Sequence, residues 1–151
     1  MSQHVPTTEL IPFQGVTPIL RVRSLSASID HYVHVLGFKL DWLVEESGFG
    51  SVSRGLCHLF LCEGDQGNVG AWVWIGVENV ETVFDEYRQA GARLRHPPTN
   101  YPWALEMQVE DPDGNVLRIG SDSKKDQPWG EWLDMRGDRW AMLPTGEWVR
   151  V

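Results

Sequence analysis

Few side chains in this sequence could do chemistry, and two helix-spaced histidines are the first to consider. His31 and His34 lie three residues apart, a spacing that on a helix can chelate a metal ion. In an internal repeat their counterparts are Glu86 and Gln89, which are ordinary solvent-facing residue types. No cysteine lies nearby in sequence to complete a four-ligand zinc site. We therefore interpret the pair as part of a solvated helix face.

Two further titratable groups are candidates for a cavity. His58 shares one strand face with Phe60 and Cys62, where it is either a hydrogen-bonded core histidine or a polar group of the cavity. Glu106, near Trp103, is the one fair candidate for a carboxylate in a low-dielectric cleft. The chain contains neither a Gly-x-Ser-x-Gly motif nor a phosphate-binding glycine loop, so nucleophilic catalysis has no organised signal.

An internal repeat predicts which elements position these groups. Residues 22–32 (VRSLSASIDHY) return as residues 77–87 (VENVETVFDEY), 55 positions further on. Ser24 and Asn79 precede the apolar periodicity of each copy and are expected to cap a helix. Each copy also has an apolar strand before the helix and three extended segments after it. The sequence therefore predicts an α+β fold of two tandem βαβββ modules with curved mixed sheets and a shared binding surface.

The predicted organisation is a single domain of five segments. They are an irregular leader (1–15), a first module (16–63), a glycine-rich linker (64–70), a second module (71–122) and a tryptophan-rich extension (123–151).

Two segments beyond the second helix carry separate predictions. Residues 97–103 (PPTNYPW) are expected to form a rigid, proline-spaced loop between strands. Residues 138–151 predict a C-terminal β-hairpin around a turn at 144–146. The extension holds four of the eight tryptophans, which favours packing on the body or on a second subunit; the alternative is a lid over a ligand site. These are Trp129, Trp132, Trp140 and Trp148.

Strand alternation places two other tryptophans on a face without a helix. Val73, Ile75 and Val77 share one face of their strand. Ile75 and Val77 match the aliphatic Leu20 and Val22 of the first copy, so this set is expected to pack beneath the helices. Trp72 and Trp74 therefore face the concave side of the sheet, where they need something flat to pack against. The C-terminal hairpin, a second subunit and an aromatic ligand remain open as the partner.

Charge and composition exclude some classes of protein. The net charge is −8, and no concentrated basic face is present for a nucleic-acid backbone, whereas an acidic surface could attract cationic small molecules. No apolar run approaches the roughly 20 residues of a membrane span, and the N-terminus lacks signal-peptide features. Cys57 and Cys62 should point to opposite faces of one strand and stay free. We expect a cytoplasmic protein that binds neither nucleic acid nor membrane.

The two modules resemble the vicinal oxygen chelate superfamily, within it the glyoxalase/bleomycin-resistance branch. The likeness is carried by residues 17–38 (TPILRVRSLSASIDHYVHVLGF) and 111–119 (DPDGNVLRI), and it covers about residues 15–122. Residues 58–67 and 101–115 are similar to bleomycin-resistance-type members in particular. Because this superfamily hosts lyases, dioxygenases, isomerases, thiol transferases and drug-binding proteins, the fold does not define the chemistry.

The resemblance also locates where a metal would bind in metal-dependent members. Their two histidine positions are here Thr17 and Trp72, and their glutamate position is Arg118. An indole has no suitable lone pair, and a guanidinium is a permanent cation that repels a divalent ion. We therefore expect no bound metal and no other cofactor.

The resemblance implies a homodimer with grooves at the subunit interface that sequester a planar aromatic or cationic compound, such as an antibiotic. We assign no catalytic residue. The alternative is a metal-free or atypical enzyme of the same superfamily, a lyase, isomerase or dioxygenase-like protein acting on a small molecule, with His58, Glu106 or Arg118 in the cavity. A protein–protein module that uses the C-terminal tryptophans fits a concave aromatic face less well. The predicted ligand-binding residues are Trp42, His58, Phe60, Trp72, Trp74, Trp103, Glu106 and Arg118.

Overall fold

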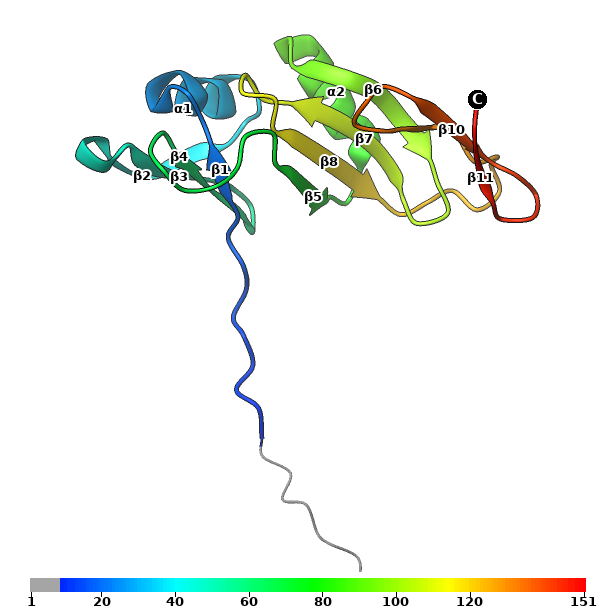
Figure 1. The fold of residues 1–151 in the computed structure, drawn as a ribbon, viewed down its shortest axis with the longest axis horizontal. Helices are drawn as coiled ribbons and strands as arrows, with labels where there is room; N and C mark the ends of the chain where they lie inside the picture. The colour runs from blue at the N-terminus through cyan, green and yellow to red at the C-terminus, as the bar shows by residue number, and fades with distance from the viewer. Residues whose placement is uncertain (1–8) are drawn as a thin grey trace, which may run out of the picture.

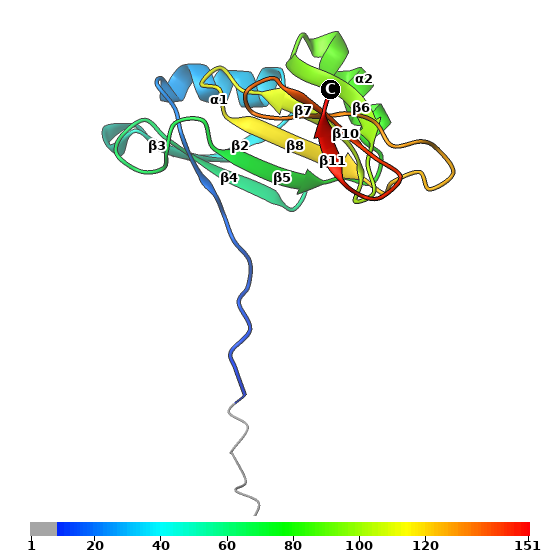
Figure 2. The same ribbon diagram turned by 45° about the vertical axis from the view of Figure 1, so that its right-hand side comes forward.

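The computed structural model describes residues 9–151, so residues 1–8 of the predicted leader lie outside the described part. The chain forms two mixed four-stranded sheets, each with one α-helix, and a three-stranded sheet near the C-terminus (Figure 1). Both helices lie on the same side of the sheets, and residues 9–18 extend away from the helix-free side (Figures 1 and 2). Within the described residues, no helix is long and apolar enough to span a membrane.

The first module has the predicted βαβββ order. Its strand order is β1-β4-β3-β2, with β1 parallel to β4 and the remaining pairs antiparallel. Its elements are β1 (Ile19–Arg21), α1 (Leu25–His34), β2 (Lys39–Val44), the 3-10 helix η1 (Glu45–Ser47), β3 (Phe49–Arg54) and β4 (Cys57–Cys62).

The second module repeats this topology, which confirms the predicted fold class. Its order β5-β8-β7-β6 has the same pattern, again with the outer first strand parallel to the last. Its elements are β5 (Trp72–Gly76), α2 (Val80–Ala90), β6 (Arg93–Asn100), β7 (Leu105–Glu110) and β8 (Val116–Ser121).

Each helix begins at the polar residue that the sequence indicates. Ser24 Oγ accepts a hydrogen bond from the backbone N–H of Ala27, and Asn79 Oδ1 accepts one from Thr82, so each cap satisfies an otherwise unpaired amide of the first turn. The second helix ends at Gly91 with φ +77°, a left-handed conformation that favours glycine. Local sequence therefore fixes the start of both helices and the end of α2.

Two buried tyrosines at equivalent positions of the repeat hold the modules together. Tyr32 of α1 donates a hydrogen bond of 3.0 Å to Oδ2 of Asp111, at the turn between β7 and β8. Tyr87 of α2 donates one of 2.8 Å to the carbonyl of Leu36 in the first module. Each helix therefore reaches into the other module, and the two sheets are locked side by side.

The proline-rich segment 97–103 differs from the prediction. Pro97 and Pro98 belong to β6, which continues to Asn100, so only the residues after Asn100 form a loop. β6 is an edge strand, and its register with β7 shifts on both sides of His96. An edge strand with such irregularities tolerates residues that cannot donate to the ladder, which is why the prolines do not end it.

The C-terminal extension contains the predicted hairpin and one further strand. β10 (Arg139–Met142) and β11 (Trp148–Arg150) form the hairpin, and β9 (Trp132–Leu133) completes a sheet of order β11-β10-β9. A two-residue strand within a polar segment has no periodicity to reveal it. The segment before β9 is held to the second module by Gly130, whose N–H donates to the Asn100 carbonyl, and by the Tyr101 hydroxyl, which donates to the Glu131 carbonyl.

All three tyrosines of the chain are shielded from water, which predicts a steep loss of stability in alkali. Burial raises the pKa of Tyr87 and of Tyr101 to about 12, and burial together with Asp111 raises the pKa of Tyr32 well above 10. Unfolded tyrosine ionises near pH 10. The contribution of each tyrosine to the free energy of unfolding is therefore fully present below pH 10. It falls by about 1.4 kcal/mol per pH unit as the pH rises from 10 toward the pKa of the folded tyrosine.

Denaturant unfolding at a series of alkaline pH values, with tyrosinate absorbance followed in parallel, tests this expectation. A folded protein that gains tyrosinate absorbance with a midpoint near pH 10 would contradict the buried positions of these side chains.

Candidate functional site

The helix-free face of the first sheet carries an aromatic cluster. Trp42 stacks on Phe49 with ring centroids 5.8 Å apart, and Phe60 lies 5.5 Å from Trp42 and 5.4 Å from Phe49. Trp42 remains 42% exposed, so the cluster presents an apolar surface to solvent. The predicted residues Trp42 and Phe60 are thus in contact, and Phe49 is a member that the sequence analysis missed.

A register shift explains why Trp42 joins this face. The pairing of β2 with β3 slips between Leu40 and Trp42, which lets two consecutive residues of β2 contact the same side of β3. Asp41 accepts hydrogen bonds from Ser51 and Ser53 while Trp42 contacts Phe49. A bulge of this kind has no sequence signature, so Asp41 could not be identified beforehand.

His58 lies at the edge of this face and not in the core. Its ring is about half exposed, and its Nδ1 lies 3.8 Å from Oδ2 of Asp41. The hydrogen bond from Ser53, followed by that from Ser51, lowers the pKa of Asp41 and keeps this carboxylate charged beside the imidazole. Of the two alternatives for His58, the polar position at a cavity is the one the structure supports.

The second sheet places Glu106 and Arg118 in one ion pair. The carboxylate of Glu106 is fully buried, and its two oxygens lie 3.0 Å and 2.9 Å from Nε and Nη2 of Arg118. The indole N–H of Trp103 donates to the same carboxylate, and the Arg118 guanidinium lies 4.8 Å from the ring centroid of Trp132. These contacts occupy the hydrogen-bonding positions of the Glu106 carboxylate within the chain. The carboxylate is therefore better suited to a structural role than to acid–base catalysis.

Trp74 has a different environment on the same sheet. It is 52% exposed, and its six-membered ring lies over two glycines, one on its own strand β5 and one on the adjacent strand β8. A Cβ atom at Gly76 would lie 3.0 Å from Cζ3 of Trp74, and one at Gly120 would lie 3.1 Å from Cζ2. The glycines thus leave room for the indole against the sheet, and about half of the Trp74 surface remains exposed to solvent.

Trp72, two residues earlier, is partly buried. The guanidinium of Arg95 lies 5.5 Å from its ring centroid, and Arg95 is itself held by Gln108 and Glu110. Arg95 also donates to the carbonyl of Asp134 in the C-terminal extension. Trp72 is therefore covered by an arginine that anchors the extension, whereas Trp74 is free.

An open groove of about 960 Å³ lies between the two modules. It is bounded by the beginning of β4, by β5 and by α2, and both Trp74 and His58 line it. Trp103 and Arg118 line a separate pocket of about 610 Å³ beside the C-terminal strands. Trp42 and Phe60 line neither, so a single chain does not bring the eight predicted residues into one cavity.

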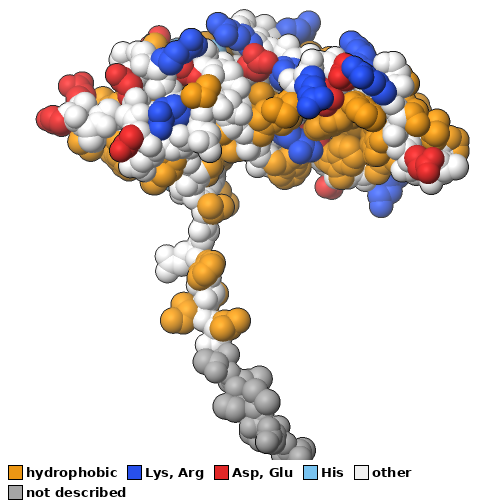
Figure 3. Space-filling model, viewed as in Figure 1, with side chains coloured by type: hydrophobic (Ala, Val, Ile, Leu, Met, Phe, Trp, Pro, Cys, Tyr) orange, Lys and Arg blue, Asp and Glu red, His pale blue; other side chains and the backbone are white. Residues whose placement is uncertain are grey.

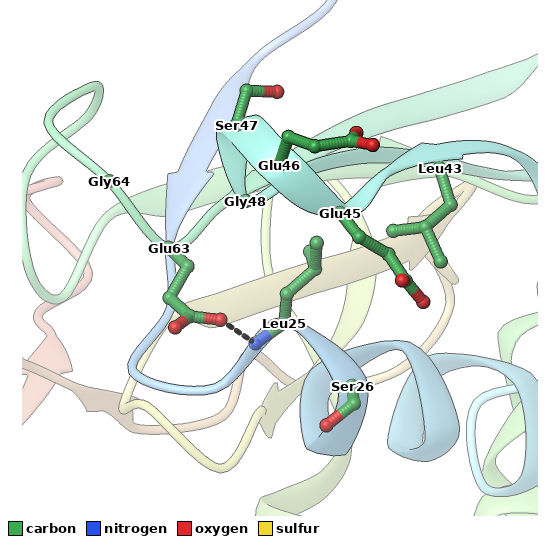
Figure 4. A pocket seen from close by; sticks show the side chains of 9 residues that line it. All are labelled: Leu25, Ser26, Leu43, Glu45, Glu46, Ser47, Gly48, Glu63 and Gly64. Atoms are coloured by element: carbon green, nitrogen blue, oxygen red, sulfur yellow. Dashed lines mark hydrogen bonds between the residues drawn. The ribbon is translucent and has the colours of Figure 1, made fainter.

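A third pocket, of about 420 Å³, lies at the beginning of α1 and contains none of the predicted residues (Figure 4). Three glutamates line it, but Glu63 already accepts a hydrogen bond of 2.8 Å from the backbone N–H of Leu25. Glu63 thus caps the helix amide that follows Ser24. One of the three glutamates of this pocket is therefore engaged in helix capping.

The residues at the superfamily's metal-ligand positions do not fit a divalent ion. Arg118 is committed to Glu106, and the ring of Trp72 lies beneath a second guanidinium. Across residues 9–151, no three His, Cys, Asp or Glu side chains are grouped so that they could hold a metal ion. The donor set therefore supports no metal-dependent step.

Comparison with known proteins identifies the family. Residues 14–119 match the family model of the Glyoxalase/Bleomycin resistance protein/Dioxygenase superfamily, and the chain belongs to this superfamily. The match ends before β9, so the C-terminal sheet lies outside it. Among curated protein sequences, none matches this chain.

Several solved structures share the fold at low sequence identity. The bleomycin-binding protein from Streptomyces verticillus, complexed with copper(II)-bleomycin, is 23% identical with a TM-score of 0.64, over 76% of this chain and 100% of that chain. TioX from Micromonospora sp. ML1 is 19% identical with a TM-score of 0.62, over 72% and 98%. A glyoxalase/bleomycin resistance protein/dioxygenase from Nocardioides is 19% identical with a TM-score of 0.60, over 80% and 91%.

The buried ion pair predicts opposite results for single and double substitution. Glu106→Gln leaves the Arg118 guanidinium without its counter-charge and should lower the free energy of unfolding by about 3–5 kcal/mol. Combining it with Arg118→Met removes both charges and should recover most of that loss. Denaturant unfolding of the three proteins measures this. If the double variant were no more stable than Glu106→Gln alone, the unpaired charge of Arg118 would not be the cause of the lost stability.

Proposed function

We propose that this protein binds a planar aromatic or cationic small molecule without transforming it, in the manner of a sequestering protein. The observation that carries the proposal is the half-exposed indole of Trp74, which lies over Gly76 and Gly120 at the edge of the groove between the modules. An aromatic surface held in place by the sheet can stack on a flat ring, and it attracts a cation through its π-face.

The groove around Trp74 suits such a ligand. Its volume of about 960 Å³ lies within the range of small-molecule sites, and most of its lining is aliphatic or aromatic. Polar groups are few: His58, Glu78 and Arg54 lie among them. The net charge of −8 favours the approach of cations.

Family membership and the fold of the bleomycin-binding protein support a drug as the ligand class. Sequestration of an antibiotic would confer resistance on the cell that makes the protein. The two cysteines, Cys57 and Cys62, are free thiols, which supports our inference that the protein acts in the cytoplasm.

We further propose that two chains pair and complete the groove. All six residues of β2, an edge strand, are exposed, and four of them are the apolar or aromatic residues Leu40, Trp42, Leu43 and Val44. Leu10, Ile11 and Phe13 of the extended N-terminal segment are 88–98% exposed (Figure 3). A partner that covers these surfaces would remove apolar area and an open sheet edge from water. It would also add Trp42 and Phe60 to the ligand site.

A metal-free enzyme is the alternative, and it depends on His58. The imidazole lies near the charged Asp41 at the groove, an arrangement that can orient a general base. Glu106 and Arg118 satisfy each other and contribute little to this alternative. Turnover of a substrate that ceases in His58→Gln would favour it over sequestration.

Removal of the Trp74 indole should weaken ligand binding while the fold persists. With bleomycin and the planar cation ethidium as probes, Trp74→Ala should raise Kd by about 2- to 30-fold, since one stacking or cation–π contact contributes about 0.5–2 kcal/mol. Trp129→Ala, which removes an exposed indole outside the groove, is the matched control and should leave Kd unchanged.

Calorimetry gives Kd, and mass spectrometry of the recovered probe shows whether it has been altered. Equal binding by Trp74→Ala and wild type would place the ligand elsewhere, and chemical conversion of the probe would overturn sequestration.

The dimer has its own test. Sedimentation at micromolar concentration should give a dimer for the wild type, and Trp42→Glu should shift it toward monomer by placing a charge on the exposed strand. Val69→Glu adds the same charge to an exposed linker residue and should not change the sedimentation. A wild-type monomer at this concentration would remove the intersubunit groove.

A further inference from the structure

Four tryptophans surround the pocket of about 610 Å³ beside the C-terminal strands, which we call the tryptophan cup. Only Trp103 and Arg118 come from the family-matched region; the other lining residues come from the extension. Hydrophobic side chains gather at this end of the molecule, over the C-terminal strands (Figures 1 and 3). The lining residues are Trp103, Arg118, Trp132, Asp134, Trp140 and Trp148.

The walls of the cup are inclined to one another. The ring of Trp103 makes an angle of 71° with that of Trp132 and 49° with that of Trp148, and both centroid separations are 5.8 Å. Tyr101, fully buried, stacks on one face of Trp103 at 4.8 Å and 6°, which fixes that wall from behind. A flat ligand could stack on only one inclined wall, whereas a rounded group can contact several at once.

The polar groups of the cup favour a positive ligand that needs no hydrogen bonds. The indole N–H groups of Trp103 and Trp140 already donate hydrogen bonds to the carboxylates of Glu106 and Asp134, respectively. Oδ1 of Asp134 also accepts hydrogen bonds of 2.8 Å and 3.0 Å from the backbone N–H groups of Arg136 and Asp138. Three donors thus orient a carboxylate at the cup.

Within the described chain, the carboxylate of Asp134 is not matched by an ion pair, although the positive charge of Arg136 lies near enough to act on it. Arg118 is paired with Glu106, and Arg95 with Glu110. Asp134 forms no ion pair with any side chain between residues 9 and 151. The Arg118 guanidinium lies 4.8 Å from the centroid of Trp132, so one ring of the cup already accommodates a cation.

We propose that the tryptophan cup binds a methylated ammonium group, of the kind carried by choline and by betaines. Such a group is round, positively charged and without N–H donors when fully methylated, so it matches inclined indole faces beside one carboxylate. The cup shares no lining residue with the groove at Trp74. The proposal therefore goes beyond the function proposed for the groove and does not depend on it.

A charged ligand and its neutral isostere provide the sharpest test. The intact chain is titrated with choline, with glycine betaine and with 3,3-dimethylbutan-1-ol, which has the shape of choline but no charge. Nuclear magnetic resonance of the indole N–H groups reports which tryptophans respond. Choline should perturb Trp140 and Trp148 and bind at least tenfold more tightly than the neutral alcohol.

Substitutions then separate the cup from the groove. Trp148→Ala should weaken choline binding at least tenfold, and Asp134→Asn should weaken choline binding much more than alcohol binding. Trp129→Ala and Trp74→Ala should leave choline binding unchanged, while Trp74→Ala weakens the planar probe. If Trp148→Ala does not fold, the Asp134→Asn comparison still decides the question, since it retains the side-chain shape.

Two outcomes would overturn the proposal: equal affinity for choline and the neutral alcohol, or choline binding lost in Trp74→Ala and retained in Trp148→Ala. Preference for betaine over choline would support it and assign the ligand's carboxylate to Arg118. Preference for choline would support it with Asp134 as the sole charged partner.

Discussion

The hydrogen bond from Tyr32 to Asp111 is the contact on which the arrangement of the two modules depends. Asp111 also accepts hydrogen bonds from the backbone N–H groups of Asp113 and Asn115 and from the Asn115 side chain. The side chain of Asn115 in turn donates a hydrogen bond to the carbonyl of Arg21 at the end of β1. It also accepts one from the backbone N–H of Ala71, the residue before β5. Buried polar groups must be paired to be tolerated, so this turn fits only one placement of the first module.

That placement decides where a ligand can bind. With α1 and α2 on one side of the sheets, the strand residues that point the other way receive no cover from a helix. Aromatic residues on that side remain partly exposed in both modules, as Trp42 and Trp74 show. The groove between the sheets follows from the same geometry, because it lies between β4 and β5, which are not paired with each other. The binding surface is therefore a consequence of the repeat and of the contacts that lock its copies.

Local patterns in the sequence were sufficient to predict the two modules. Strand alternation, helix periodicity and caps such as Ser24 and Asn79 each act within a few residues. They also placed Trp74 correctly on the helix-free face. They could not predict the bulge beside Asp41 or the passage of β6 through Pro97, since both depend on register with a neighbouring strand. The division of the candidate residues between two cavities depends on the docking of the extension, which no local pattern encodes.

The extension shows why residue type alone does not define a site. Trp74 lies over glycines and presents one open face, a geometry suited to stacking. Trp103, the same residue type on the same module, is backed by Tyr101 and meets Trp132 and Trp148 at steep angles. Because a π-face interacts according to its orientation, these indoles select ligands of different shape. A chain that adds a tryptophan-rich sheet to this fold thereby gains a second aromatic surface, and the groove between the modules stays open.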